Sequence, residues 1–191
     1  ILATTMPGYG QPHADLLAQF PHTHVLLALL RDGFHPEAPG GRVKLRSDGS
    51  AVLDYALTGF VMEGARRALL AMAELQFASG AKEVLPVHEM AQPYTSWAQA
   101  QGAIAALPMK PLLTKVVSAH VMGGCGMAGS EAQGVVRADG GHWQIENLSV
   151  HDGSIFPTSV GANPQLSIYG ITNRLAQGLV QRLTGASEAL A

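Results

Sequence analysis

The sequence predicts a fold of the α/β (α+β) class, in which an antiparallel sheet is flanked by helices. Residues 42–47 and 51–57 alternate between apolar and polar side chains on either side of an Asp-Gly step, as the two strands of a hairpin do. Apolar residues at helical spacing over 60–79 and 164–183 then predict two long helices. The two periodicities together indicate the mixed class.

The elements of the first half follow in order from these patterns. A short helix is expected around residues 14–20, and the apolar run 23–30 predicts a buried strand. Asp48-Gly49 predicts a type I′ turn, which needs positive φ at both central residues. The first long helix ends before Gly80, which suits a C-cap because glycine adopts positive φ without strain.

A seam divides the chain into two expected regions. Before it, residues 82–87 predict a short strand, and the Ala- and Gln-rich segment 94–107, bounded by prolines, predicts a further helix. The seam lies near Pro108 to Pro111. The region 1–110 is expected to be a substrate-side sheet-and-helix region, and the region 111–191 carries the motifs described below.

The second region predicts strands over 115–118 and 148–152 and the final helix over 164–183. The stretch between the strands is rich in turn residues. The buried stripe of the final helix is expected to consist of Ile168, Ile171, Leu175, Leu179 and Leu183.

Composition and charge exclude several classes of function. Charged residues make up 14% of the 191 residues and the net charge is −2, so the chain lacks the basic surface of a nucleic-acid-binding protein. No apolar run reaches the roughly 18 residues of a membrane span. The single cysteine, Cys125, excludes an internal disulfide, and without a basic neighbour it is not expected to be an activated nucleophile.

The N-terminus lacks a basic segment followed by an apolar one, so no signal peptide is evident and we expect a cytoplasmic rather than a secreted location. Ile1 is not an initiator methionine. We therefore expect a fragment, a processed product or a trimmed chain, and these three alternatives stay open.

His120 begins the segment HVMGGCGM, residues 120–127. An imidazole is a natural base near physiological pH, which makes this side chain a candidate for proton transfer. The glycines that follow let the backbone turn tightly and leave room for a planar ligand. The competing interpretation is a core histidine that is hydrogen-bonded at the end of a strand.

Asn163-Pro164 opens the final helix. The structural interpretation is an Asn N-cap followed by Pro at the first helical position. The functional interpretation is an anion site, because a helix N-terminus presents free N–H groups and a partial positive charge. The amides of Gln165 and Leu166 would then face the negatively charged edge of a ligand.

Asp152 closes the predicted strand 148–152 and leads into Gly153. Ligands of open α/β sheets lie beyond the carboxyl ends of strands, where an acid can accept hydrogen bonds from ribose or ribityl hydroxyls. The competing interpretation is an Asx-turn after the strand.

Taken together, three ordered motifs resemble the C-terminal segment of the flavin-dependent glucose–methanol–choline (GMC) oxidoreductases. They are HVMGGCGM at 120–127, NLSVHDGSIFP at 147–157 and Asn163-Pro164. With asparagine rather than a second histidine in the last motif, the chain resembles the choline, cholesterol and long-chain alcohol oxidases. The sequence around His120 is similar to that of bacterial members that act on sterols or long-chain alcohols.

The resemblance implies an FAD-dependent alcohol oxidase or dehydrogenase without a metal, which transfers hydride from an alcohol carbon to flavin N5. It implies that His120 is the active-site imidazole and that Asn163 is its hydrogen-bonding partner. The residues that it assigns to FAD binding are Asp152, Gly153, Asn163, Pro164, Gln165 and Leu166.

Some expectations concern what the chain lacks. No G-x-G-x-x-G follows a predicted strand and opens a helix, so the N-terminal FAD-binding portion is expected as a partner outside these 191 residues. One alternative is a non-catalytic domain that binds an apolar ligand. Another is a metal-dependent hydrolase that uses some of the eight histidines, with His22 and His24 as a possible metal pair. His88 and Glu89 are expected at a solvated loop end rather than in a substrate cavity.

Overall fold

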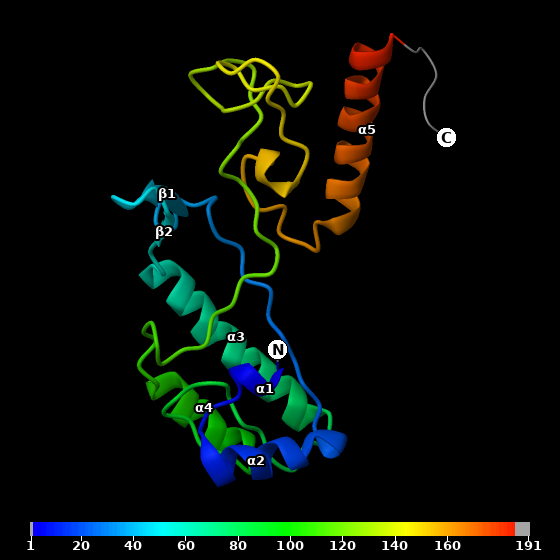
Figure 1. Cartoon of the computed structure of the whole chain (residues 1–191). Coiled ribbons are helices and arrows are strands. Elements are labelled where there is room, and N and C mark those ends of the chain that lie inside the picture. The colour runs from blue at the N-terminus through cyan, green and yellow to red at the C-terminus, as the bar shows by residue number, and fades with distance from the viewer. Residues whose placement is uncertain (1, 186–191) are drawn as a thin grey trace. The chain divides into compact units, whose positions relative to one another are not determined.

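The structure, a computed structural model, describes residues 2–185 (Figure 1). In chain order its elements are α1 (Leu2–Thr5), α2 (Gly10–Ala18), the 3₁₀ helix η1 (Phe20–His22), β1 (Gly41–Leu45), β2 (Ala51–Tyr55), α3 (Gly59–Ala78), α4 (Trp97–Ala106), the 3₁₀ helix η2 (Gly153–Ile155) and α5 (Gln165–Thr184). Helices are thus combined with a two-stranded antiparallel sheet, and the predicted fold class is confirmed.

The described chain divides into two compact units that are interleaved in sequence. One contains residues 2–30 and 57–117, and the other contains residues 31–56 and 118–185. The predicted regions 1–110 and 111–191 stay a prediction, and residues 1 and 186–191 lie outside the described part.

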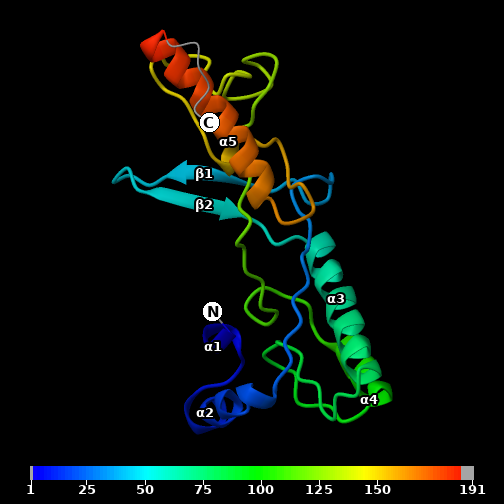
Figure 2. The same ribbon diagram turned by 90° about the vertical axis from the view of Figure 1, so that its right-hand side faces the viewer.

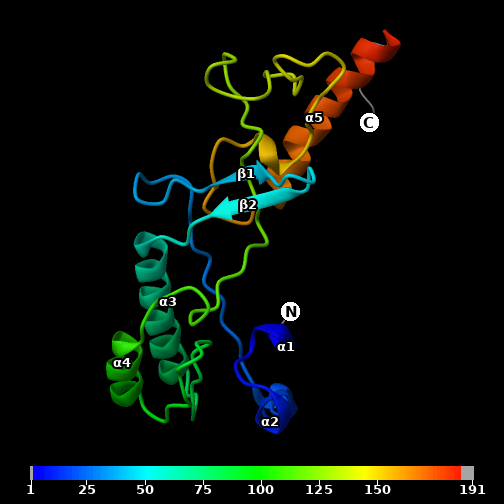
Figure 3. The same ribbon diagram turned by 60° about the vertical axis from the view of Figure 1, so that its left-hand side comes forward.

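The first unit is built on α3 and α4, which lie side by side (Figure 3). Helical periodicity predicted α3 to within one residue at each end, and Gly80 follows it at φ +91° as expected. Ser96 caps α4 by accepting a hydrogen bond from the Gln99 amide. One cluster of buried residues in this unit consists of Ala73, Val84, Tyr94, Ala100 and Ile104.

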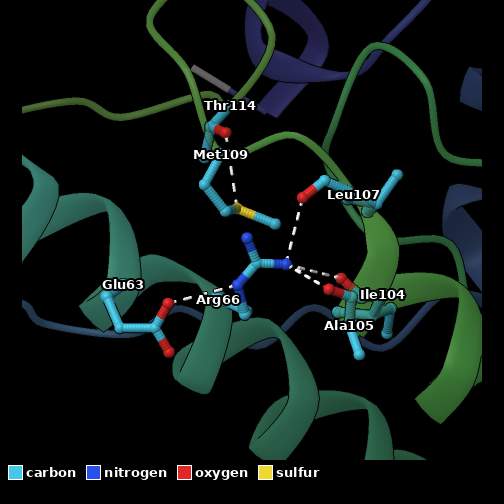
Figure 4. A network of polar contacts seen from close by, with 7 residues as sticks. All are labelled: Glu63, Arg66, Ile104, Ala105, Leu107, Met109 and Thr114. Atoms are coloured by element: carbon cyan, nitrogen blue, oxygen red, sulfur yellow. Dashed lines mark hydrogen bonds and ion pairs between the residues drawn. The ribbon is translucent and has the colours of Figure 1, made fainter.

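Arg66 joins the two helices at the C-terminus of α4 (Figure 4). One guanidinium nitrogen donates to the carbonyls of Ile104, Ala105 and Leu107, at 3.4 Å and 3.0 Å for the first and last. Its Nε donates to Glu63 at 3.2 Å. The last carbonyls of a helix lack intrahelical donors and carry partial negative charge, so a cation stabilises this end.

The second unit contains the hairpin of β1 and β2 (Figure 2). Val43 pairs with Leu53, and Lys44 on the other face forms an ion pair with Asp54 at 2.5 Å. The hairpin is confirmed, but its type I′ turn is wrong. Gly49 has φ +82° whereas Asp48 does not have positive φ, because the Asp48 carboxylate accepts the Ser50 amide at 2.9 Å and favours a turn with one left-handed residue.

A cluster of buried residues in this unit is formed by irregular turns between residues 126 and 150, by η2 and by the helix α5 (Figure 1). Val136, Ile155 and Leu175 are buried together. Of the stripe predicted for α5, Leu175 is buried, while Leu183 is exposed because the core ends before the last turn of the helix.

Four predicted strands do not form among the described residues. None of the segments 82–87, 115–118 and 148–152 forms a ladder. They contain or adjoin only isolated bridges, namely Val84↔Tyr94, His88↔Thr114 and Gly141↔Ser149. Segment 23–30 is also irregular, and the side chains of Leu27 and Leu29 are exposed rather than buried. Apolar β-branched runs predict strands only where a partner strand lies beside them, and these segments lack one.

No helix within residues 2–185 is long and apolar enough to cross a membrane.

Candidate active site

The second unit contains a hollow of about 770 Å³. This volume falls within the range of about 300–1,000 Å³ that is typical of small-molecule sites. Three chain segments form it, and all three had been singled out by sequence motif. Its lining consists of Ala119, His120, Val121, Met122, Gly123, Asp152, Gly153, Ser154, Asn163, Pro164, Gln165, Ile168 and Tyr169.

The glycine turn holds the backbone behind His120. Gly123 and Gly124 have φ of +80° and +95°, a conformation that favours glycine. Beyond the turn the chain runs beside η2: the Cys125 amide donates to the Ser154 carbonyl at 3.0 Å, and the Met127 amide donates to the Ile155 carbonyl at 2.8 Å. The His120 side chain is exposed and makes no hydrogen bond within the described chain. It is therefore not the hydrogen-bonded core histidine of the competing interpretation.

Asp152 forms the Asx-turn that was the structural alternative. Its Oδ1 accepts the Ser154 amide at 2.7 Å and the Ser154 hydroxyl at 2.5 Å, and it thereby caps η2. The hydroxyl bond and then the amide bond lower the pKa of the Asp152 carboxyl, so the side chain is an anion at neutral pH. Both bonds go to Oδ1, which leaves Oδ2 for the hydroxyl of a ligand.

Gly153 allows η2 to pack closely against its neighbours. A Cβ at this position would lie 3.0 Å from Cδ1 of Ile168 and 3.2 Å from the Val121 carbonyl oxygen. Glycine therefore lets η2 approach both α5 and the segment after His120, and this close packing forms the floor of the hollow.

Asn163 lies immediately before the cap of α5, Pro164, which has φ −86° and ψ −5°. The helix thus begins one residue later than predicted. The Asn163 side chain makes no hydrogen bond within residues 2–185, so it does not act as the predicted N-cap. The first amide with a helical acceptor is that of Ile168, which donates to Pro164, and the preceding amides of the first turn are available to a ligand.

The structure also places residues around the hollow that the sequence did not single out. Tyr169 lies one turn beyond Gln165 and accepts a hydrogen bond from its side chain at 2.6 Å. The i, i+4 spacing of these two polar residues at a helix start was the available signal. Leu166, in contrast, is 83% exposed and is not among the lining residues, so only its amide remains a candidate contact.

Several other candidates lie elsewhere. His88 was expected at a solvated loop end, and this is wrong: the ring is buried, with Nδ1 accepting the Met90 amide at 3.1 Å and Nε2 donating to the Pro108 carbonyl at 3.2 Å. These two bonds give it a structural role. Among the described residues no group of three or more His, Cys, Asp or Glu side chains could hold a metal ion.

Comparison with protein families decides the family. The model of the GMC oxidoreductases that covers their C-terminal domain matches residues 36–172, which is more than half of the chain. The chain belongs to the GMC oxidoreductase family. The match includes the hairpin, the glycine turn, η2 and the first turns of α5.

Several curated proteins are similar to this GMC chain. The long-chain-alcohol oxidase FAO4A of Arabidopsis thaliana is 28% identical over 174 residues, which are 87% of this chain and 23% of that protein. An uncharacterised GMC-type oxidoreductase of Mycobacterium tuberculosis is 29% identical over 180 residues, 94% of this chain and 27% of that protein. The cholesterol oxidase of Acinetobacter baumannii is 40% identical over 57 residues, 30% of this chain and 10% of that protein.

The chain spans at most about a quarter of the length of these relatives, since 27% is the largest share covered. Both plant and bacterial proteins are matched, so a bacterial origin stays a prediction. No solved structure matches the chain.

Proposed function

We propose that this chain is the substrate-side, C-terminal part of an FAD-dependent alcohol oxidase or dehydrogenase. The observation that carries the proposal is that His120, Asn163, Asp152 and the first turn of α5 line the same hollow. Membership of the GMC family supports the reaction class, and relatives named for long-chain alcohols and for cholesterol support an apolar alcohol as substrate.

The donors and acceptors around the hollow fit a flavin. Val121, Met122 and Ile168 offer apolar surface for the face of a flat ring. The first turn of α5 offers N–H groups and a partial positive charge for an anionic ring edge. Oδ2 of Asp152 offers an acceptor for a sugar or ribityl hydroxyl. When bound, FAD would accept the hydride that leaves the alcohol carbon.

The side chains of this chain would handle the hydroxyl group. An imidazole nitrogen of His120 takes the hydroxyl proton as the carbon–oxygen bond becomes a carbonyl, a step that contributes about 10²- to 10⁴-fold to the rate in comparable sites. The Asn163 carboxamide donates a hydrogen bond to the alcohol oxygen and holds it in place. Neither side chain has a competing partner in the described chain, so both are available to the substrate.

The test is a fusion that joins the part of FAO4A upstream of the matched region to this chain. Flavin reduction by a long-chain primary alcohol or by cholesterol is followed without oxygen in a stopped-flow spectrometer. His120→Ala should lower the rate of flavin reduction by about 10²- to 10⁴-fold. His22→Ala, a histidine outside the hollow, should leave that rate unchanged.

Asn163→Ala should lower kcat, with Asn173→Ala on the exposed side of α5 as the matched control. Unchanged flavin reduction in His120→Ala would refute the proposal and favour a non-catalytic domain that binds an apolar ligand. A folded fusion that retains no flavin would contradict the role assigned to Asp152 and the first turn of α5.

A further inference from the structure

The segment that presents Asn163 is not held by its own backbone. Between Pro157 and Asn163 no backbone-to-backbone hydrogen bond is formed within the part of the chain that the structure describes. Within the segment, the Gly161 amide donates to the Ser159 hydroxyl at 3.2 Å. The position of Asn163 therefore depends on contacts from outside the segment.

These outside contacts come from residues 31–33, more than 120 positions earlier in the chain but in the same compact unit. Nε of Arg31 donates to the Ser159 carbonyl at 3.2 Å. The Thr158 hydroxyl donates to the Gly33 carbonyl at 3.1 Å. These two bonds hold Thr158 and Ser159, which lie five and four positions before Asn163.

Arg31 also packs against the turn that leads into Asn163. Gly161 has φ +73°, and a Cβ there would lie 3.3 Å from Cδ of Arg31. The guanidinium lies 4.3 Å from the centroid of the Phe34 ring, an arrangement that restricts its orientation. The arginine thus supplies a directed donor and a surface to the same short segment.

Residues 32 and 33, which adjoin Arg31, are themselves held in place by hydrogen bonds. The Tyr55 hydroxyl at the end of β2 donates to Oδ2 of Asp32, while Oδ1 of Asp32 accepts the Gly33 amide at 2.7 Å. Burial and the Asp32 hydrogen bond raise the pKa of Tyr55 to about 12, so the hydroxyl remains a donor at neutral pH. Asp32 is therefore occupied by Tyr55 and Gly33, and the Arg31 guanidinium has no ion pair among the described residues.

We propose that Arg31 is a positioning residue that fixes the segment 158–161 and through it the Asn163 carboxamide. Arg31 does not line the hollow, so it acts through Asn163 rather than on the substrate. The inference deepens the proposed function and rests on it, because it assigns Arg31 to the alcohol-binding side of the same site.

The first arm of the test uses the chain alone and does not depend on activity. Nitrogen-15 relaxation gives backbone order parameters for residues 158–163 in the wild type, in Arg31→Met and in Arg174→Met, an exposed arginine on α5. Arg31→Met should lower these order parameters from about 0.8 towards about 0.6, the value typical of flexible backbone. Residues 123–127, held by their own backbone hydrogen bonds, should not change.

The second arm uses the fusion enzyme and a double-mutant cycle. Arg31→Met should lower kcat by about three- to tenfold with KM for a long-chain alcohol unchanged, because misplacement of a catalytic group affects the reacting geometry rather than binding. In the Asn163→Ala background the same substitution should have no further effect on kcat. Arg174→Met should resemble the wild type in both backgrounds.

The outcomes separate this inference from the proposed function. Unchanged order parameters in Arg31→Met, or kcat losses that are additive with Asn163→Ala, would overturn the positioning role. If Arg31→Met frees the segment but no fusion shows alcohol-dependent flavin reduction, the proposed function fails, and the Arg31 role fails with it as a role in catalysis.

Discussion

Replacing Arg66 by Met should destabilise the first unit strongly, and the structure gives the size of the effect. The substitution removes three bonds from a charged donor to the C-terminus of α4 and an ion pair to Glu63. Hydrogen bonds to charged groups contribute about 1.5–3 kcal/mol each, but these three share one nitrogen and do not add. With a charge–dipole contribution of about 0.3–1 kcal/mol, the expected loss is about 2–4 kcal/mol.

Two further variants test this reasoning: one isolates the contribution of the ion pair and the other is a control. Glu63→Gln removes only the ion pair of a largely exposed glutamate at i, i+3, which contributes about 0.3–0.5 kcal/mol. Arg67→Met removes an exposed arginine from the next position of α3, which has no partner in the described chain, so it should change stability by less than about 0.5 kcal/mol. Methionine is a good helix former, so the helix itself is not weakened.

Thermal unfolding followed by far-ultraviolet circular dichroism measures the difference. For a domain of 150–250 residues each kcal/mol shifts Tm by roughly 2–4 °C, so Arg66→Met should lower Tm by roughly 5–15 °C. Glu63→Gln and Arg67→Met should lower it by less than about 2 °C. A Tm for Arg66→Met close to that of Arg67→Met would refute the reasoning, and an equal loss in Glu63→Gln would show that the ion pair, not the helix end, matters.

Three further outcomes are expected. Gly153→Ala should destabilise the protein by about 1–3 kcal/mol in urea unfolding, because its Cβ would lie 3.0 Å from Cδ1 of Ile168. The hydrogen bond from the Gly141 amide, and then two nearby arginines, lower the pKa of the Asp139 carboxyl. The stability that this carboxylate contributes to the fold is therefore present above the unfolded pKa and lost as pH falls through the folded pKa. Asp139→Asn should accordingly reduce the fall of Tm at acid pH. The purified chain alone should carry no stoichiometric flavin absorbance, because the nucleotide fingerprint is absent from its sequence.

The sequence predicted those elements whose partners are close in the chain. The hairpin was correct because β1 and β2 are joined by five residues, so alternation and a turn signal suffice to specify the pair. The helices α3 and α5 were correct because helical hydrogen bonds are local. Even so, the turn type was wrong, since the Asp48 carboxylate selects the turn by a bond to Ser50 that composition does not specify.

The strands predicted for 23–30 and 148–152 were wrong because a strand depends on a partner that the local sequence does not specify. A strand forms only with a partner, and an apolar run carries no information about which partner is present. Residues 148–152 instead meet the turn at Gly140 and Gly141 through single bonds, such as that from the Val150 amide to the Gly140 carbonyl at 2.9 Å. The contact of Arg31 with Ser159 spans 128 positions and had no local signal.

The site shows where motif interpretation alone is ambiguous and geometry is informative. Asp152 and Asn163 are both short polar residues before a helical turn. The rule that such side chains accept nearby backbone amides gave an Asx-turn for Asp152 and an N-cap for Asn163. In the structure Asp152 satisfies the rule and retains one oxygen for a ligand, whereas Asn163 makes no such bond. A helix start whose asparagine does not cap it has an unused carboxamide beside unused amides. That combination, facing the same hollow as His120, is what a substrate oxygen and an anionic cofactor edge require together.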